Sequence, residues 1–348
     1  MFEILKALTE LPGAVGNEQP VQRFLRERWA PLSQETHADG AGNLIAHVGG
    51  RGKKLLITAH ADEVSFLIKS ISEDGYLFLN SNQLGLRPAH YLYMIGQPAL
   101  GIGYDGERVE GVFAAATGHA TSAAQREQPQ REWNDIFVDI GAEDAEEVRA
   151  RGLDVGCPVI WNPTTRRFGK YFCGKAMDDR LGLAVMDSLL HQIQPVNLQY
   201  DLYLASTVQE ELGMVGASAV PLQIPLDLVI CLEIGLAGDI PTVSERDIPA
   251  KLGGGPLLIF KDSYVHYSRN LTLALRRVAT SRGMPVQSAV LPSFASDGLQ
   301  FIRAGIATAL LAAPTRYTHS PFEMTHEDDL VAMVDLLHAF LVTDLHIE

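Results

Sequence analysis

From about residue 168 onward, short apolar runs alternate along the chain with longer segments of helical periodicity. The runs with the length and apolar content of buried strands are Asp201–Thr207, Leu226–Leu232, Val286–Leu291 and Ile306–Ala312. The helices expected beside them lie at 180–193, from Gly213, around 268–281 and near Gly298. Strands that alternate with helices form a sheet covered by helices. The pattern therefore predicts an α/β domain with a mixed sheet.

Both ends of the chain fit the same domain. A helical pattern over 21–29 is followed by two expected strands, at 43–48 and 54–59. The closing helix is expected to begin with Thr325 as its N-cap and Asp328 three residues later, which resembles a capping box.

Between residues 65 and 167 the pattern changes. Short β-type runs alternate with Gly, Pro and Asp turns, and one short helix is indicated at 142–151. Such a pattern predicts a small, β-rich domain inserted into the larger one. We therefore expect residues 1–64 and 168–348 to form the α/β domain and residues 65–167 to form the insertion.

The charge balance excludes several classes of function. The chain of 348 residues carries 28 Lys and Arg against 42 Asp and Glu, a formal net charge of −14. This field repels nucleic-acid phosphates and anionic membrane surfaces. No apolar stretch reaches the roughly 20 residues of a membrane helix, and the start of the chain lacks a signal-peptide pattern. We expect no nucleic-acid or membrane partner, three free cysteines and a cytoplasmic location.

Side chains that bind metals follow the expected strands where these end. They are His60 and Asp62 after 54–59, Glu210 and Glu211 after 201–207, Glu233 after 226–232, and His319 after 306–312. Ligands of open α/β sheets bind beyond the carboxyl ends of the strands. Parallel strands would therefore bring these side chains to one edge, near Asp178 at the start of the next helix. Paired acids also occur at helix N-termini for purely structural reasons, but structural acids have little reason to gather at strand ends.

Two divalent cations about 3.5–4 Å apart need a bridging carboxylate and further His and carboxylate ligands on each ion. We assign Asp178 as the bridge. Glu211 and His319 are then expected on one metal, and His60 and Glu233 on the other.

Two more acids at this edge have expected roles. Asp62 can accept the imidazole N–H of His60 and fix the ring tautomer. Glu210 adjoins a ligand without being needed as one, so we expect it to act as the general base on water and then as the proton donor to the leaving amine.

Two further motifs predict no cofactor-binding site. The run Gly253–Pro256 lacks the Lys-Ser/Thr of a phosphate loop. Ser296 lacks a nucleophile elbow, so an N-cap role is expected for it.

The motifs, in their order along the chain, resemble peptidase family forty-two of the metallopeptidases, the TET-type glutamyl and leucyl aminopeptidases. They are Gly42-Asn43-Leu44-Ile45-Ala46, His60-Ala61-Asp62-Glu63, Ala176-Met177-Asp178-Asp179-Arg180-Leu181-Gly182, Gln209-Glu210-Glu211-Leu212-Gly213 and Arg316-Tyr317-Thr318-His319-Ser320-Pro321. The resemblance extends over almost the full length.

This resemblance implies a zinc-peptidase domain of the phosphorylase/hydrolase-like type, interrupted by a PDZ-like dimerisation domain. It implies a cocatalytic pair of zinc or cobalt ions, although His and carboxylate ligands also suit manganese. A hollow dodecamer built from dimers is common in the family. The family's metal ligands and base fall on the residues assigned above, and its acid that supports a ligand without binding the metal falls on Asp62.

We therefore predict a two-metal aminopeptidase that removes N-terminal residues from peptides. Glu233 stands where the family more often has Asp, which favours the first alternative, a two-metal carboxypeptidase or N-acyl-amino-acid deacylase. A glycosidase of the endoglucanase type, with Glu210 and Glu211 as its acid pair, leaves His60 and His319 unexplained. A self-assembling scaffold with structural metals is the non-enzymatic alternative.

Overall fold

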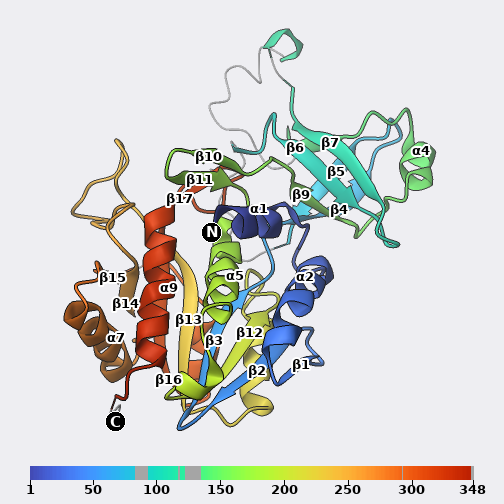
Figure 1. Ribbon diagram of the computed structural model, residues 1–348. Helices are drawn as coiled ribbons and strands as arrows, with labels where there is room; N and C mark the ends of the chain where they lie inside the picture. Colours follow the sequence, from blue (N-terminus) through green and yellow to red (C-terminus); the bar gives the residue numbers. More distant parts are fainter. Residues whose placement is uncertain (83–92, 117, 122–134, 292, 346–348) are drawn as a thin grey trace. The chain divides into compact units, whose positions relative to one another are not determined.

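The computed structural model describes residues 1–82, 93–116, 118–121, 135–291 and 293–345 (Figure 1). Contacts divide the chain into two compact units. The first, the α/β unit, contains Met1–Glu63, Thr165–Thr318 and Glu323–Glu348. The second, the barrel unit, contains Val64–Thr164, and residues His319–Phe322 are grouped with it.

The α/β unit is built on a mixed sheet that has 11 strands within the described residues. Its order is β1-β2-β12-β3-β13-β16-β17-β11-β10, with β14 and β15 attached beside β16. The four central strands, which run parallel, are β12 (Asp201–Thr207), β3 (Lys54–His60), β13 (Leu228–Leu236) and β16 (Ala307–Arg316). The other strands are β1 (Glu35–Ala38), β2 (Leu44–Gly50), β10 (Arg166–Phe168), β11 (Tyr171–Gly174), β14 (Leu257–Lys261), β15 (Gln287–Val290) and β17 (Glu323–His326). The predicted α/β fold with a mixed sheet is confirmed.

Helices cover both faces of this sheet (Figure 1). They are α1 (Phe2–Glu10), α2 (Gln19–Trp29), α5 (Met177–Leu190), α6 (Val215–Ala219), α7 (Arg269–Ser281), α8 (Gly298–Arg303) and α9 (Glu327–Leu341). Alternate residues of β3 belong to different cores, because successive strand side chains point to opposite faces. Leu55 and Ile57 pack with α1, α2, α5 and α9, whereas Leu56 packs with α6 and α8. Helix α5 is buried along almost its whole length.

The barrel unit has a core of its own. Its closed barrel, in the order β4-β5-β8-β7-β6-β9, leaves no open sheet edge. The elements are β4 (Phe66–Ile71), β5 (Leu77–Ser81), β6 (Pro98–Ile102), β7 (Arg108–Ala114), β8 (Phe137–Asp139), β9 (Pro158–Trp161) and α4 (Ala145–Ala150). Phe66 packs edge-on against Phe113 and Trp161, with ring centroids 5.6 and 5.5 Å apart.

The predicted N-cap of the closing helix is wrong. Thr325 lies in β17 opposite Thr315, and its hydroxyl donates to the Pro314 carbonyl at 3.2 Å. Helix α9 begins at Glu327, and the Nδ1 atom of His326 accepts the Asp328 N–H at 3.2 Å. The strand pairing therefore extends two residues further than the local capping pattern indicates.

Three smaller expectations can be compared with the structure. The N-cap of α8 is Asp297 rather than Ser296, although the Ser296 hydroxyl accepts the Gly298 N–H at 3.1 Å. Cys157, Cys173 and Cys231 are free, as predicted. Among the described helices, none has both the length and the apolar character that a membrane crossing requires.

Candidate metal centre

The strand register places two of the expected ligands side by side. β3 and β13 pair in parallel, with Leu56 opposite Val229 and Thr58 opposite Cys231. Because strand residues alternate between faces, the same register continued by two residues puts His60 and Glu233 on one face at the carboxyl edge. Asp178 joins them from the first turn of α5.

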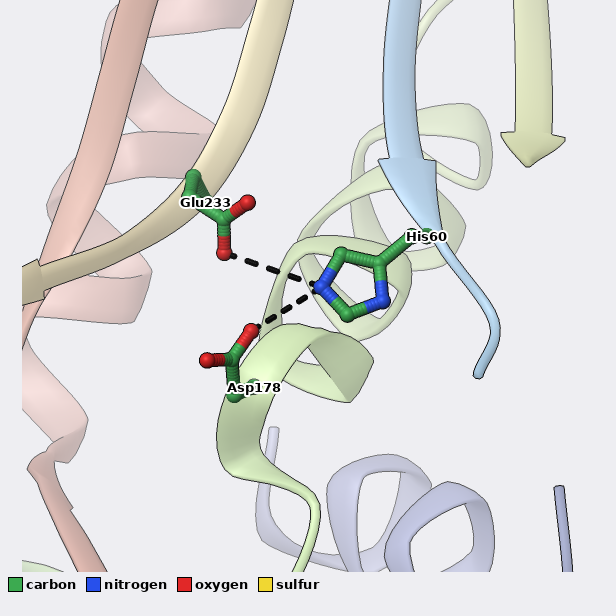
Figure 2. A group of neighbouring side chains, drawn as sticks. All are labelled: His60, Asp178 and Glu233. Atoms are coloured by element: carbon green, nitrogen blue, oxygen red, sulfur yellow. Dashed lines mark hydrogen bonds and ion pairs between the residues drawn. The ribbon is translucent and has the colours of Figure 1, made fainter. Parts of the chain in front are cut away.

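These three side chains form a compact, buried group. The His60 Nε2 atom lies 2.9 Å from Asp178 Oδ1 and 3.9 Å from Glu233 Oε1. Figure 2 shows both carboxylates turned toward the same imidazole nitrogen. The ligand atoms of all three residues lie within 4.8 Å of one another, and no side chain is more than a tenth exposed. This is a geometry in which one cation can bind a nitrogen and two oxygens.

A second group of ligands shares Asp178. His319 lies on the loop 319–322, whose ends continue directly into segments of the α/β unit. Ligand atoms of Asp178, Glu211 and His319 lie within 4.8 Å of one another. In the described part of the chain, therefore, two groups of three ligands have one carboxylate in common. That arrangement fits a pair of divalent cations with Asp178 between them.

Glu233 reaches its position with a side chain one methylene longer than the Asp that the resemblance leads us to expect there. Its Oε1 atom accepts the N–H of the next residue, Ile234, at 2.9 Å. A hydrogen bond to the neighbouring residue keeps the carboxylate close to its own backbone. The additional methylene is thus compatible with a place in the His60 group.

The acids at this edge are held in conditions that oppose their ionisation. Burial raises the pKa values of Glu210, Glu233 and Asp179 well above their usual range, and neighbouring carboxylates raise them further. Burial lowers the pKa of His60, but hydrogen bonds to Asp178 and Asp62, together with the charges of Asp62 and Glu233, outweigh this effect and raise the net pKa. Buried carboxylates this close together are stable only when bound protons or a cation compensate their charge. A concentration of buried carboxylates of this kind is what the two groups of metal-binding side chains would require.

Asp62 contacts both His60 and the segment that carries Glu210 and Glu211. The His60 Nδ1 atom lies 3.4 Å from the Asp62 carboxylate and 3.2 Å from its backbone oxygen. The two carboxylate oxygens accept the N–H groups of Glu210 and Glu211, each at 3.0 Å. Asp62 therefore orients the backbone of the 210–211 pair, a contact that the sequence did not predict.

Left-handed backbone conformations gather on the segments that carry these residues. The non-glycine residues of the described chain with positive φ are Ala176, Gln209, Met214, Tyr317 and His319. Each lies within three residues of Asp178, Glu210, Glu211 or His319, or is one of these. Such conformations are unfavourable for residues with a Cβ and cluster at functional sites.

Several residues near the groups were not predicted from the sequence. Buried Glu323 accepts the Asp178 N–H at 3.2 Å across a separation of 145 residues. Glu18 accepts the Gln209 N–H, and burial together with the charge of Asp62 raises the Glu18 pKa to about 7. Lys175 and Glu63 form a buried ion pair at 2.6 Å. No local pattern reveals these contacts, because each partner lies far away in the sequence.

Comparison with known proteins gives consistent matches over almost the whole chain. A family model described as M42 glutamyl aminopeptidase matches residues 42–336. A putative aminopeptidase, FrvX, of Escherichia coli strain K12 is 31% identical over 98% of this chain and 95% of its own length.

Solved structures agree with the sequence matches. Aminopeptidase APDkam598 from the archaeon Desulfurococcus kamchatkensis superposes with a TM-score of 0.92 at 27% identity, covering 98% of this chain and 94% of its own. The TET1 peptidase of Pyrococcus horikoshii, described as assembling into a tetrahedron or a large octahedral shell, superposes with a TM-score of 0.87 at 26% identity, covering 98% of both chains.

Proposed function

The chain belongs to the M42 glutamyl aminopeptidase family, and from this premise we propose that it hydrolyses the N-terminal peptide bond with two divalent cations at the carboxyl edge of its sheet. The family is metal-dependent. Its matched members are described as aminopeptidases, which supports the same activity for this chain. The observation that carries the two-metal proposal is that one carboxylate, Asp178, belongs to both ligand groups.

The proposed ligand assignment uses five side chains. Asp178 would be common to both cations, His60 and Glu233 would complete one site, and Glu211 and His319 would complete the other. Bound divalent cations polarise a carbonyl oxygen and lower the pKa of a coordinated water. Zinc, cobalt and manganese all accept nitrogen and carboxylate ligands of this kind.

Glu210 is the proposed general base. Asp62 holds its N–H at 3.0 Å, so the backbone from which the side chain projects is oriented. Burial raises the Glu210 pKa well above its usual range, and the carboxylates of Asp297, Glu211 and Asp62 add to the rise, with His60 opposing it. A raised pKa suits a carboxylate that first takes a proton from water and then gives it to the leaving amine.

Glu233 favours a second candidate activity, because Glu at this position is more frequent in two-metal carboxypeptidases and deacylases. A free substrate amine distinguishes the reactions. An aminopeptidase requires it, whereas a deacylase cleaves the bond to an acylated amine. The glycosidase alternative gives no role to the imidazoles of the two ligand groups.

We also propose a large homo-oligomer, by analogy with the TET1 peptidase, which can assemble into a tetrahedron or a large octahedral shell. The barrel unit, close to residues 65–167, is the proposed dimerisation domain. Peptides are the proposed partners, and the cytoplasm is the proposed location.

The test combines metal analysis with a substrate panel. We expect about two divalent ions per chain and hydrolysis of aminoacyl-p-nitroanilides that chelation abolishes and metal restores. Cleavage of N-acetyl amino acids in preference to these substrates would favour the deacylase. Activity on cellulose that is insensitive to chelators would favour the glycosidase.

A further inference from the structure

Four consecutive backbone N–H groups, from Val208 to Glu211, donate to three buried side chains from the N-terminal part of the chain. Val208 donates to Asn43 Oδ1 and Gln209 to Glu18 Oε1, both at 3.1 Å. Glu210 and Glu211 donate to the two oxygens of Asp62, both at 3.0 Å. We call Glu18, Asn43 and Asp62 the amide clamp. Their exposed fractions are 3%, 0% and 0%.

The clamped segment depends on these acceptors because it belongs to no helix or strand. Strand β12 ends at Thr207 and helix α6 begins at Val215. Two of its carbonyl groups accept from the first turn of α6: Val208 accepts the Gly216 N–H at 2.9 Å, and Gln209 accepts the Val215 N–H at 3.1 Å. The N–H groups have no such local partners, and buried N–H groups require acceptors. The clamp therefore ties the loop to the rest of the α/β unit.

Asn43 joins both ends of this loop. Its Nδ2 atom donates to the Gly216 carbonyl at 2.8 Å while its Oδ1 atom accepts from Val208. A Cβ atom at Gly216 would lie 2.3 Å from Asn43 Oδ1. The loop thus closes tightly around this amide.

Glu18 meets the loop at one of its two non-glycine residues with a left-handed backbone, the other being Met214. Gln209 has a φ of 55°, in the left-handed region, and it directly precedes Glu210. The same Glu18 oxygen also accepts the Gly16 N–H at 2.7 Å. A change in the backbone at Gln209 would redirect both side chains that follow it.

The segment that carries Glu18 is itself anchored. Gly13 donates to Glu63 Oε1 at 3.0 Å, and the Glu63 N–H donates back to the Gly13 carbonyl at 3.0 Å. Lys175 holds the same Glu63 carboxylate through contacts of 2.8 and 2.6 Å. Glu18 therefore presents its oxygen from a supported segment, as residues behind a metal site must do to keep it in place.

We propose that Glu18 is a positioning residue for the hydrolysis, because its hydrogen bond to Gln209 fixes the backbone from which Glu210 and Glu211 project. This inference rests on the roles proposed above for Glu210 and Glu211. It requires an acceptor oxygen at this place and no contact of Glu18 with substrate or metal.

The test compares Glu18→Ala and Glu18→Gln in the full-length, metal-loaded enzyme. We expect Glu18→Ala to lower kcat by about 10- to 100-fold, the range for a displacement of up to about 1 Å, with KM changed by no more than about threefold and metal content unchanged. Glu18→Gln keeps an oxygen that can accept both N–H groups and should restore most of kcat. Hydrogen exchange of the 208–211 amides should be faster in Glu18→Ala only. Glu27→Ala, an exposed change on α2, is the control and should behave as the wild type.

Three results would overturn the inference. The first is a wild-type kcat and unchanged amide exchange in Glu18→Ala. The second is an equal loss of kcat in Glu18→Gln, because the acceptor oxygen would then not be the cause. If Glu18→Ala fails to fold, Glu18→Met, which fills a similar volume without an acceptor oxygen, replaces it, and a wild-type kcat there is the third. An inactive wild type would instead refute the proposed function, so the two failures are distinguishable.

Discussion

Replacing Asp62 by Asn tests whether orientation of the 210–211 pair limits the reaction. Asn has nearly the same shape as Asp, but only one of its two terminal atoms accepts hydrogen bonds. One of the N–H groups that Asp62 now accepts, both at 3.0 Å, would face an NH₂ group instead. In Asp62→Asn, the side-chain NH₂ group therefore faces a backbone N–H of the segment that carries the proposed base, so that two hydrogen-bond donors lie against each other.

The expected magnitude follows from these two contacts. Hydrogen bonds to a charged acceptor contribute about 1.5–3 kcal/mol each, and a buried donor left without an acceptor costs about 1–3 kcal/mol. We expect Asp62→Asn to lower the free energy of unfolding by about 2–4 kcal/mol. If the segment moves by about 1 Å, kcat should fall by about 100-fold.

Asp329 provides a matched control. Its buried carboxylate also accepts two backbone N–H groups, from Gly253 and Gly255, both at 2.7 Å. Asp329→Asn should therefore cost a similar stability, measured as the midpoint of urea unfolding, while kcat at 25 °C stays within about twofold of wild type, because the hydrogen bonds it loses hold a different turn. Equal kcat in the two variants would refute the reasoning, since loss of activity would then follow stability alone.

Three further changes test other parts of the site and the fold. Glu210→Gln should keep the metal content of the wild type and lower kcat by about 10²–10⁴-fold, the range for general acid–base catalysis; an active variant would exclude Glu210 as the base. Asp178→Asn should lower the bound metal, measured by elemental analysis, at both sites rather than one; loss of a single ion would contradict the bridge. Burial alone would raise the pKa of Asp239, but its hydrogen bonds and ion pair with Arg316 lower it below the usual 3.8. The pair therefore stabilises the fold fully above pH 3.8 and progressively less as the pH falls through the folded pKa. The urea midpoints of wild type and Asp239→Asn should accordingly converge toward acid; a constant difference would contradict this.

The periodic patterns were sufficient for the architecture. Strand β12 has the predicted bounds, Asp201–Thr207, and the alternation of strands and helices indicated the mixed sheet. Such patterns reflect which residues of a single helix or strand are buried, so they can be detected in a short stretch of sequence. The start of α9 differed because the pairing of Thr325 with Thr315 belongs to the tertiary structure.

By itself, the sequence determined the α/β class and the set of side chains that can bind metals at strand ends. Only the tertiary structure decided which of them meet, including Asp178 as the residue common to both ligand groups. It alone revealed the amide clamp, in which Glu18 reaches Gln209 across 191 residues. The backbone N–H is the same chemical group in every residue except proline. No sequence pattern therefore specifies which distant acceptor it will contact once the chain is folded.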